Sequence, residues 1–527
     1  MTEKRENWGS KLGLILAMAG NAVGLGNFWR YPYQAAKNGG GAFMIPYFGA
    51  LILMGIPLMF VEWSLGRYGG KYGHGSLGPM VYLQAREGIK PKTAAILGGF
   101  AGAIALGVTV LVNSYYNHII GWTLGYSWLS LTGAYMDPSI NTGDFFFSHY
   151  LMSPGLTFTF WIMALVILYF GVSGGIQKGI EVIAKFMMPT IYVVGAILIV
   201  RTLTLGSPVN PDWSPIKGLD FIWSPRWQDL NWGAALAAAG QIFFTLSLGM
   251  GIICNYASYL KPDDDIVLSG IATVSLNELA EVILGGTIAI PIAYTYMGME
   301  GMQASIGLSF VSLPNIFRNM GGGQIFGAFW FILLAFAGIT SAVAMYNYIV
   351  ALLEESFGMA KKKASLLVFF LYIVVGLPVC LEGFILGSVT LTYFSEVDFW
   401  VGTYLLVVLG GLEAVVVGWI NGKNSLDEIN RGSYWKLPSW FYKLFVQFLT
   451  PVSIMILLIM STIEYGKAGL FKLVPDSIIK TPELAPWLNG GRLVVATVLV
   501  LGFIQAYKTI KDKYGVELQS GQVSIRK

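Results

Sequence analysis

The chain has 527 residues, of which 55% are hydrophobic and only 12% charged, and its net charge at pH 7 is +4. An average soluble domain has roughly 25% charged residues, so these charges are too few to cover a soluble protein of this length. The same numbers exclude a disordered chain, a collagen and a nucleic-acid-binding protein, which needs a basic face. The composition therefore predicts an integral membrane protein.

Apolar stretches of about 20 residues, long enough to cross a membrane, recur along the whole chain. The first follows a charged segment without a small-residue cleavage site, so we interpret it as a retained span and not as a signal peptide. Loops with glycine and proline separate the stretches. The twelve predicted spans are Leu12–Ala36, Ala42–Gly66, Ala94–Trp128, Leu156–Gly171, Val182–Leu205, Trp232–Tyr259, Ile266–Tyr294, Ile325–Ser356, Leu366–Leu381, Val397–Ile420, Phe441–Ile463 and Leu493–Lys508.

The distribution of Lys and Arg between the loops predicts the orientation of the chain. The loops after the second, eighth and tenth spans are rich in Lys and Arg, as are both termini, whereas the segment Ser127–Gly155 has neither residue. Lysines between the last two spans weaken this contrast without reversing it. Because positive loops stay in the cytoplasm, we expect a multi-pass protein of the plasma (inner) membrane with both termini cytoplasmic.

The cysteines and histidines suggest no metal or redox chemistry. Cys254 and Cys380 both lie in strongly apolar runs, where small buried side chains are the simplest interpretation. They indicate neither a disulfide framework nor a zinc site. His74, His118 and His149 are scattered and form no recognisable cluster.

Two of the predicted spans carry sequences that disfavour a continuous helix. The first contains Gly20–Asn27, with three glycines and two amides, and the sixth contains Phe244–Gly251. Glycine costs about 1 kcal/mol in a helix interior, and backbone groups left free in hydrocarbon cost several more. Close helix packing through small residues is the alternative explanation. Interruptions in the first and sixth spans favour two five-span halves related as an inverted repeat, as in secondary transporters.

A broken helix exposes free backbone groups inside the membrane. Amides near Leu25 and Gly26 can bind a carboxylate, and nearby carbonyls can bind Na⁺ or an ammonium group. Neutral side-chain oxygens of the kind that small hard cations prefer lie close by: Asn27, Thr245, Asn277, Thr340 and Ser341. The predicted spans around these residues lack the rows of acidic side chains that are typical of a cation channel. The pattern therefore favours a Na⁺-coupled transporter of a zwitterion, whose carboxylate supplies the missing negative charge.

At these residues the chain resembles a known family. The stretch Gly20–Tyr33 (GNAVGLGNFWRYPY) is similar to the first-helix signature of the neurotransmitter:sodium symporter family, as are Asn38–Phe43 and Gln241–Gly249. The resemblance runs from Arg5 to about Lys508 and is closest to the bacterial amino-acid members of the leucine-transporter type. It implies an all-α membrane protein of twelve helices with the leucine-transporter fold, broken in helices 1 and 6. We expect one transporter domain, 1–527, with repeats at about 11–205 and 232–420 and two further helices at about 441–508.

The resemblance implies two sodium sites and no organic cofactor. The first sodium site would use the Ala22 carbonyl, Asn27, Thr245, Asn277 and the carboxylate of the substrate itself. The second would use the carbonyls of Gly20, Val23 and Ala337 with the hydroxyls of Thr340 and Ser341.

The resemblance also places the substrate between the two ions. Its carboxylate would meet the Leu25 and Gly26 amides and the Tyr116 hydroxyl, and its ammonium group would meet carbonyls of Ala22, Phe244 and Thr245 with the Ser247 hydroxyl. The residues implied around its side chain are Val112, Tyr116, Phe244, Met250, Ser341 and Met345. Without the resemblance, Met250 and Met345 would be interpreted as ordinary residues of the hydrophobic core.

Gates are implied in the same way. Arg30 and Asp398 match an extracellular ion pair above Tyr116 and Phe244, although charged residues that reach out from helix ends are an alternative explanation. The cytoplasmic pair would be Arg5 and Glu355, with Trp8, Ser258 and Tyr259 nearby. Gly179 and Pro189 match a helix-unwinding motif associated with release of the second sodium ion, with a proline kink as the competing interpretation.

Departures from the family pattern sharpen the expected substrate. Gly24 stands where carriers of monoamines have Asp, which favours amino acids over amines. Glu281 stands where chloride-dependent members have a small hydroxyl residue, so we expect chloride independence, and proton counter-transport stays open. Met250 and Met345 replace stiffer side chains, which leaves the choice among hydrophobic amino acids open.

We therefore expect a sodium-coupled symporter of neutral, hydrophobic amino acids that works by alternating access in the lipid bilayer. No nucleic-acid partner is expected, and a homodimer stays open. An intramembrane enzyme is disfavoured because no nucleophile-and-base set, metal motif or aspartate pair is present. The remaining alternatives are a proton-coupled amino-acid transporter, a channel, and a substrate-sensing receptor on the same fold.

Overall fold

The computed structural model describes residues 6–298 and 307–523. These residues form helices joined by turns, and no strand occurs among them. The all-α class is therefore confirmed. Ten continuous helices are long and apolar enough to cross a membrane, and the bent pair Lys11–Ala22 with Gly26–Lys37 makes up to eleven spans.

The ten continuous helices lie on predicted spans two to five and seven to twelve. Their ends differ from the prediction by at most six residues, except that the last helix begins eleven residues earlier and ends twelve residues later than predicted. They are Gly41–Lys71, Pro91–Thr132, Pro154–Ser173, Ile176–Leu203, Ile266–Met297, Gly323–Phe357, Lys361–Leu386, Thr392–Asn421, Ser439–Lys467 and Pro482–Ser520. Shorter helices in the connections are α5 (Leu77–Ala85), α10 (Pro215–Trp223), α16 (Leu313–Arg318), α21 (Lys423–Asn430) and α24 (Asp476–Lys480).

The first span is broken near its middle. Helix α1 (Lys11–Ala22) is capped by Ser10, whose side chain accepts a hydrogen bond from the Gly13 nitrogen. It ends at Val23, where φ of −73° and ψ of 96° leave the helical region. The second half, Gly26–Lys37, is inclined to α1 by 48°. The glycines and amides of Gly20–Asn27 thus interrupt the helix.

The sixth span is broken into α11 (Trp232–Thr245) and α12 (Ile252–Ala257). Between them, φ is positive at Ser247 (57°), Gly249 (68°) and Gly251 (75°). A Cβ on Gly249 would lie 2.1 Å from the Leu406 carbonyl oxygen, so this position also requires glycine for space. Because the break leaves two short pieces, this span is not among the ten long helices, and a total of twelve spans stays a prediction.

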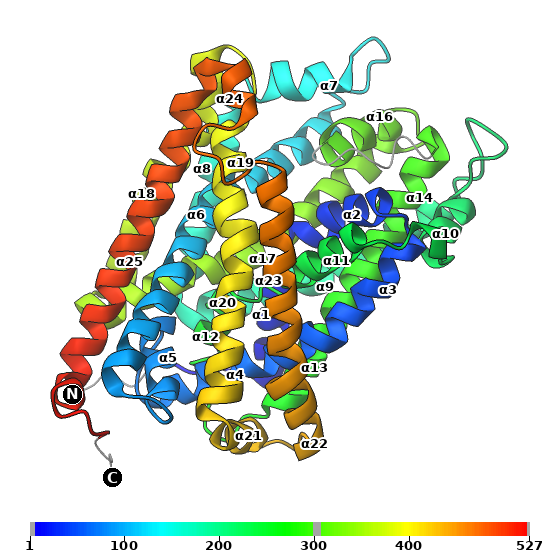
Figure 1. Ribbon diagram of the computed structural model, residues 1–527. Helices are drawn as coiled ribbons and strands as arrows, with labels where there is room; N and C mark the ends of the chain where they lie inside the picture. Colours follow the sequence, from blue (N-terminus) through cyan, green and yellow to red (C-terminus); the bar gives the residue numbers. More distant parts are fainter. Residues whose placement is uncertain (1–5, 299–306, 524–527) are drawn as a thin grey trace.

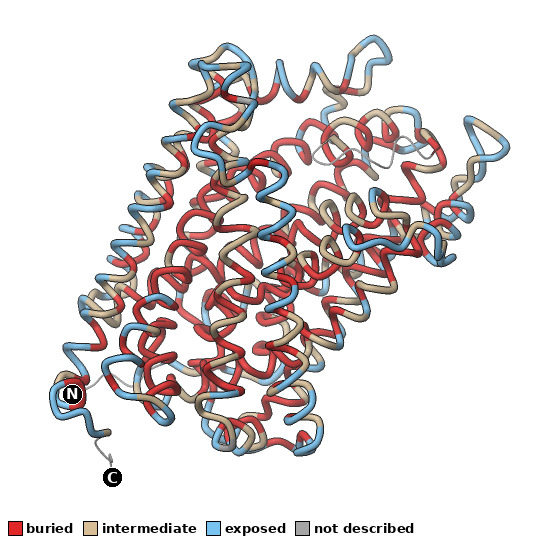
Figure 2. The backbone as a smooth tube through the Cα atoms, in the orientation of Figure 1, coloured by how far each residue is buried: buried red, intermediate tan, exposed pale blue. Residues whose placement is uncertain are grey.

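The bundle is built around two long helices, α6 (Pro91–Thr132) and α17 (Gly323–Phe357), which pack against each other (Figure 1). Helix α1 packs against α17, α9 (Glu181–Leu203) and α13 (Ile266–Glu278). The most apolar part of α17 is 83% buried, whereas that of the last helix, Pro482–Ser520, is only 28% buried. Figure 2 shows the same gradient from a buried centre to exposed outer helices. The outer helices therefore offer an apolar face to lipid.

Both ends of the described chain meet the connection between α17 and α18 (Lys361–Leu386). Glu6 pairs with Lys361 at 2.8 Å, and Lys513, in α25 (Ala485–Ser520), pairs with Glu355 at 3.2 Å. The two ends therefore lie on one side of the bundle, as an even number of spans requires. That this side faces the cytoplasm stays a prediction.

Candidate functional site

A cavity lies between the two broken helices and against α6 and α17. Its lining residues are Ala22, Gly24, Gly26, Asn27, Val112, Tyr116, Phe244, Thr245, Ser247, Met250, Ile252, Ser341 and Met345. They include every residue predicted to contact substrate except Leu25, which lines the neighbouring cavity. Ile252 was missed by the sequence argument, and its place just after the glycine-rich break was the available signal.

The polar end of this cavity is formed by the break in the first span. The Leu25 nitrogen donates a 2.9 Å hydrogen bond to the Tyr116 hydroxyl oxygen. The Ser247 hydroxyl donates to the Asn21 carbonyl at 3.0 Å, which ties the two broken helices together. A carboxylate placed here would find a hydroxyl and backbone N–H groups of a helix N-terminus, an arrangement that suits an anion.

Two glycines leave the space in which a ligand would lie. A Cβ on Gly24 would be 2.7 Å from both the Ser341 hydroxyl oxygen and the Tyr116 hydroxyl oxygen. A Cβ on Gly26 would be 2.8 Å from the Phe244 ring. Any side chain at position 24 would therefore displace the groups that surround the polar end of the cavity.

The residues predicted for the first sodium site form one buried cluster. The Asn27 side-chain nitrogen donates to Thr245 Oγ1 at 3.1 Å, Asn277 Oδ1 at 2.9 Å and Glu281 Oε2 at 3.0 Å. Three oxygens thus surround the Asn27 nitrogen, but an amide has only two N–H donors. At least one of these oxygens therefore receives no hydrogen from Asn27. A small hard cation suits such a group of oxygens. The carbonyl residue predicted to complete the set, Ala22, lines the same cavity.

Glu281 is fully buried beside this cluster. It accepts hydrogen bonds from the Thr245 hydroxyl and, at 2.9 Å, from the Gln241 side-chain nitrogen. One turn earlier, Glu278 accepts from the Tyr47 hydroxyl at 2.9 Å and from the Asn277 side-chain nitrogen at 3.2 Å. The sequence argument missed Glu278, although its spacing of three residues from Glu281 places both on one helix face.

The predicted second sodium site is assembled from α1 and α17. The Thr340 hydroxyl lies 3.0 Å from the Ala337 carbonyl and 3.5 Å from the Val23 carbonyl. The Ser341 hydroxyl lies 3.2 Å from the Gly20 carbonyl and 3.5 Å from the Val23 carbonyl. The structure thus brings all five predicted residues together, and their neutral oxygens fit a monovalent hard cation.

A second cavity lies outside the first, on the side away from the chain termini, and it includes Arg30 and Asp398 in its lining. Tyr116 and Phe244 line both cavities, so these two rings separate them. Arg30 lies over the Phe244 ring at 4.6 Å and donates to the Gln241 side-chain oxygen at 3.1 Å.

Asp398 accepts a 2.5 Å hydrogen bond from the Tyr115 hydroxyl. Arg30 and Asp398, both within the described chain, form no ion pair within 4 Å of each other. They border one cavity, as the predicted extracellular gate requires, and each is held by a different partner. Their role as a gate stays a prediction.

At the side of the chain termini, Trp8 is buried against Tyr256 of α12. Its indole nitrogen donates to the Tyr256 carbonyl at 3.1 Å, and Tyr259 is buried nearby. Arg5, the predicted partner of Glu355, lies outside the described residues. Glu355 accepts hydrogen bonds from the Ser76 backbone nitrogen at 3.0 Å and hydroxyl at 2.9 Å, and from Lys513 at 3.2 Å. These partners lie far from Glu355 in the sequence and were not predicted.

The predicted unwinding motif adjoins the second sodium site. Gly179 lies in the widened turn Ile176–Ile180, and a Cβ on it would be 1.9 Å from the Gly171 carbonyl oxygen. Pro189 lies inside α9, and its neighbour Met188 packs against Gly20. The segment between Gly179 and Pro189 thus contacts a carbonyl residue of the site, while its unwinding stays a prediction.

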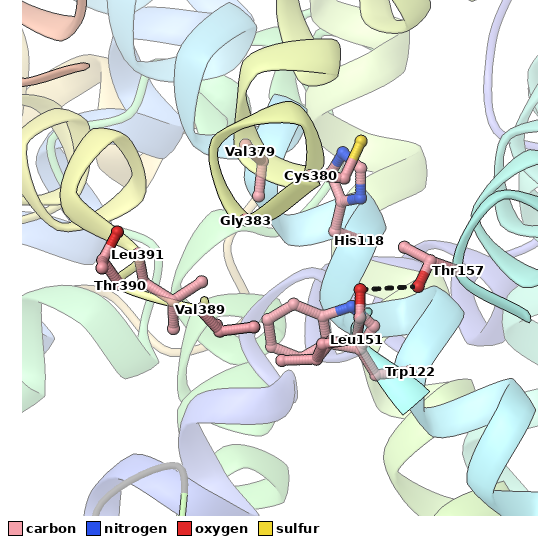
Figure 3. Close-up of a pocket in the computed structure, with 10 residues that line it drawn as sticks. All are labelled: His118, Trp122, Leu151, Thr157, Val379, Cys380, Gly383, Val389, Thr390 and Leu391. Carbon is pink, nitrogen blue, oxygen red and sulfur yellow. Dashed lines mark hydrogen bonds between the residues drawn. The ribbon is translucent and has the colours of Figure 1, made fainter. Parts of the chain in front are cut away.

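A further cavity lies between α6, α8 (Pro154–Ser173) and α18, away from the broken helices (Figure 3). His118 and Cys380 line it, and His118 stacks on Trp161 with ring centroids 4.1 Å apart. The His118 Nε2 atom lies 2.9 Å from the Gly376 carbonyl oxygen, which makes it the donor. None of the predicted substrate or sodium residues lines this cavity.

Comparison with known proteins gives a match over almost the whole chain. A profile of the sodium:neurotransmitter symporter family matches residues 5–141 and 153–511. The chain belongs to this family. Members of the sodium:neurotransmitter symporter family are sodium-coupled transporters and not enzymes.

Individual relatives agree with this assignment. The chain is 33% identical to an uncharacterized sodium-dependent transporter of Methanocaldococcus jannaschii, over 82% of this chain and 87% of the relative. It is 31% identical to an uncharacterized sodium-dependent transporter of Bacillus subtilis, over 86% and 97% of the two chains. A sodium- and chloride-dependent GABA transporter of Drosophila melanogaster is 24% identical, over 88% of this chain and 51% of its own.

Among solved structures, the chain is similar to the crystal structure of MhsT in complex with L-phenylalanine. The two superpose with a TM-score of 0.72 and 31% sequence identity, over 86% of this chain and 99% of MhsT. The likeness confirms the predicted leucine-transporter fold and its family.

Proposed function

We propose that this chain is a sodium-coupled symporter of neutral, hydrophobic L-amino acids that works by alternating access. The observation that carries the proposal is one cavity with both polar and apolar lining residues and with two clusters of oxygens, neutral apart from Glu281, beside it. Val112, Met250, Ile252 and Met345 supply the apolar lining. The similarity to MhsT, whose structure contains L-phenylalanine, supports a hydrophobic amino acid as substrate.

The coupling follows from the place of the substrate carboxylate. Next to Asn27 and Thr245, that carboxylate would complete the oxygen shell of the first sodium ion. Each ligand then binds more tightly when the other is present, and the coupling is equal in both directions. Since the protein oxygens of both sodium sites are neutral apart from Glu281, a zwitterionic substrate offsets part of the ionic charge.

Chloride independence is proposed from Glu281. Its carboxylate lies 3.0 Å from the Asn27 side-chain nitrogen, within the oxygen cluster of the first sodium site. This carboxylate, ionised while a sodium ion is bound beside it, would supply the negative charge that a bound chloride would supply. Proton counter-transport is the further step we propose to test, because this carboxylate would be left without a cation after sodium release.

Alternating access would use the contacts at the two ends of the substrate cavity. Sodium binding would favour the outward-open form, in which the rings of Tyr116 and Phe244 separate to admit substrate. Release to the other side would require Trp8 to leave Tyr256. The contacts to be broken include individual hydrogen bonds, each of which contributes little net stability and so permits reversible opening.

Uptake of radiolabelled leucine, methionine and phenylalanine into proteoliposomes tests the proposal. We expect an inward Na⁺ gradient to drive accumulation above the external concentration, with K⁺ in place of Na⁺ as the control. Uptake that is indifferent to this exchange would remove sodium coupling. Uptake driven by a proton gradient alone would favour a proton-coupled transporter, and binding without accumulation would favour a receptor.

Competition by each of the twenty amino acids for sodium-dependent binding tests the substrate class. We expect leucine, isoleucine, valine, methionine or aromatic amino acids to compete best, because the two methionines give a pliable apolar pocket. Strong competition by lysine or glutamate and none by these amino acids would contradict the proposal.

A further inference from the structure

Two glutamates and a cysteine meet in the interior of the bundle, outside the substrate and sodium sites. Glu62 lies in α4 (Ile56–Lys71), Cys254 in α12 and Glu413 in α20 (Leu405–Val415). One carboxylate oxygen from each glutamate and the cysteine sulfur all lie within 4.8 Å of one another. All three residues are 0% exposed. None of them lines the cavity between the broken helices.

Among the described residues, only one N–H group donates to the carboxylate oxygens of this cluster. Glu62 Oε1 accepts a 2.8 Å hydrogen bond from the Gly249 nitrogen, in the break of the sixth span. Glu62 Oε2 and both oxygens of Glu413 accept from no other N–H or hydroxyl group of the described residues, and the two carboxyl groups contact each other, which requires a proton between them. An unpaired buried carboxylate is costly, and two adjacent ones repel each other in a low dielectric. The cluster therefore needs positive charge, either as protons or as a cation.

We propose that Glu62, Cys254 and Glu413 form a binding site for one divalent transition-metal ion of the Zn²⁺ type. Two carboxylates and a sulfur are a mixed set of hard and soft ligands, which suits Zn²⁺ and is a poor match for Na⁺, Mg²⁺ or Ca²⁺. Three protein ligands leave a fourth position for water. Binding converts the Cys254 thiol to a thiolate and any protonated carboxyl to a carboxylate, and these protons go to the solvent.

The place of the cluster gives the ion a specific effect on transport. It joins helices from three different spans, and Glu62 also holds Gly249 within the break of the sixth span. Gly249 packs against the Leu406 carbonyl of α20, the helix that carries Glu413. A bound ion would link these segments rigidly. Since the residues just before Gly249 line the substrate cavity, we expect the ion to inhibit uptake.

Metal binding to the purified, chelator-treated protein in detergent tests the site. We expect titration calorimetry to show one Zn²⁺ bound per chain, with protons released into a weak buffer. Cys254→Ala and Glu413→Gln should each weaken Zn²⁺ binding by more than about tenfold. Cys380→Ala is the matched control, because it removes the other free cysteine and should leave binding unchanged.

Co²⁺ as a spectroscopic probe shows whether the sulfur is a ligand. The thiolate-to-cobalt absorption band should appear in the parent and in Cys380→Ala and be missing in Cys254→Ala. Equal Zn²⁺ binding by the parent and Cys254→Ala would place the ion elsewhere and overturn the proposal. Absence of Zn²⁺ binding by the parent would mean that the pair holds protons only, and would also overturn it.

Retained sodium-dependent amino-acid binding by Glu413→Gln shows that this variant is folded. If it does not fold, the comparison of Cys254→Ala with Cys380→Ala decides alone. In proteoliposomes, uptake by each variant is expressed relative to its own uptake without metal. The Zn²⁺ concentration that halves uptake should then be more than about tenfold higher for Cys254→Ala than for the parent. The binding measurements do not depend on transport, so their failure would be distinct from failure of the proposed function.

Discussion

The hydroxyl oxygen of Tyr116 accepts a 2.9 Å hydrogen bond from the backbone nitrogen of Leu25. This contact joins α6 to a backbone amide in the break of the first span, at the polar end of the proposed substrate cavity. The same hydroxyl would be within reach of a bound carboxylate. Tyr116 therefore supports the break and also presents a donor to the ligand.

Tyr116→Phe should weaken substrate binding while the ring keeps its contacts. Loss of one hydrogen bond in such a place costs about 1.5 kcal/mol, which raises KM for the amino acid by about tenfold. Tyr126→Phe is the matched control, because the Tyr126 hydroxyl is buried without a hydrogen-bond partner in the described chain. An unchanged KM for Tyr116→Phe in proteoliposome uptake would separate this hydroxyl from the substrate.

The double variant Thr340→Ala, Ser341→Ala should weaken sodium activation. It removes both hydroxyls that lie against the carbonyls of Gly20, Val23 and Ala337. We expect the Na⁺ concentration for half-maximal uptake to rise by more than about tenfold. Ser365→Ala, which removes a buried hydroxyl without a partner among the described residues, serves as the control. Unchanged sodium dependence would remove the second site.

Glu281→Ser should make transport depend on chloride. The change removes the carboxylate that accepts from Asn27 and Gln241 and leaves a small hydroxyl in its place. Uptake by the parent should be the same in chloride and gluconate, whereas the variant should require chloride. If the variant is equally active in both anions, Glu281 does not substitute for chloride.

Gly24→Ala should impair transport by steric conflict alone. The added Cβ would stand 2.7 Å from the hydroxyl oxygens of Tyr116 and Ser341, and overpacking of this kind costs about 1–3 kcal/mol. We expect amino-acid affinity to fall by about five- to 150-fold. Gly49→Ala is the control, since nothing lies within 4 Å of a Cβ there. Equal affinities for the two variants would show that the space at Gly24 is not needed.

Glu6→Gln should loosen the start of the chain. Glu6 accepts from the Ile176 nitrogen at 2.9 Å and pairs with Lys361 at 2.8 Å. Partial burial raises the pKa of Glu6, but the hydrogen bond and charge of Lys361 and the Ile176 N–H outweigh it, so the pKa lies below its ordinary value of 4.5. The contact therefore stabilises the attachment of the start of the chain above pH 4.5 and is lost as the pH falls through the lowered pKa.

Hydrogen–deuterium exchange of residues 7–13, corrected for the intrinsic effect of pH, measures this loosening. At neutral pH, exchange should be faster in Glu6→Gln than in the parent. In the parent, exchange should become faster than its own neutral-pH value only below pH 4.5. Glu396→Gln removes an ion pair with Arg492 and should leave this segment unchanged. Slower or equal exchange in Glu6→Gln would contradict the prediction.

The breaks in the first and sixth spans could be predicted because their residues violate local rules for a membrane helix. Glycines and amides in the middle of an apolar run have no satisfactory place in a straight helix facing lipid. The pocket residues followed from the resemblance to a family with the same breaks. Ile252 escaped notice because an isoleucine in an apolar run carries no signal of its own.

The ligand cluster of Glu62, Cys254 and Glu413 could not be predicted from the sequence. Its members come from three spans that are far apart in the chain, and only the tertiary fold brings them together. The available signal was a glutamate inside each of two apolar spans, which does not indicate its partner. The partners of Glu355 were missed for the same reason, because Ser76 and Lys513 reach it only through the tertiary fold. Local patterns report on helices and their interruptions, whereas such pairings depend on how the helices are arranged.

The attachment of both chain ends to the α17–α18 connection has a practical consequence. Glu6 holds Lys361 at the start of α18, and Lys513 holds Glu355 near the end of α17. A fluorescent reporter attached near either end would thus sense displacement of the same short connection. Two reporters, one near each end, would both respond to motion of this connection. Comparing their signals would show whether the two attachments release together or in sequence.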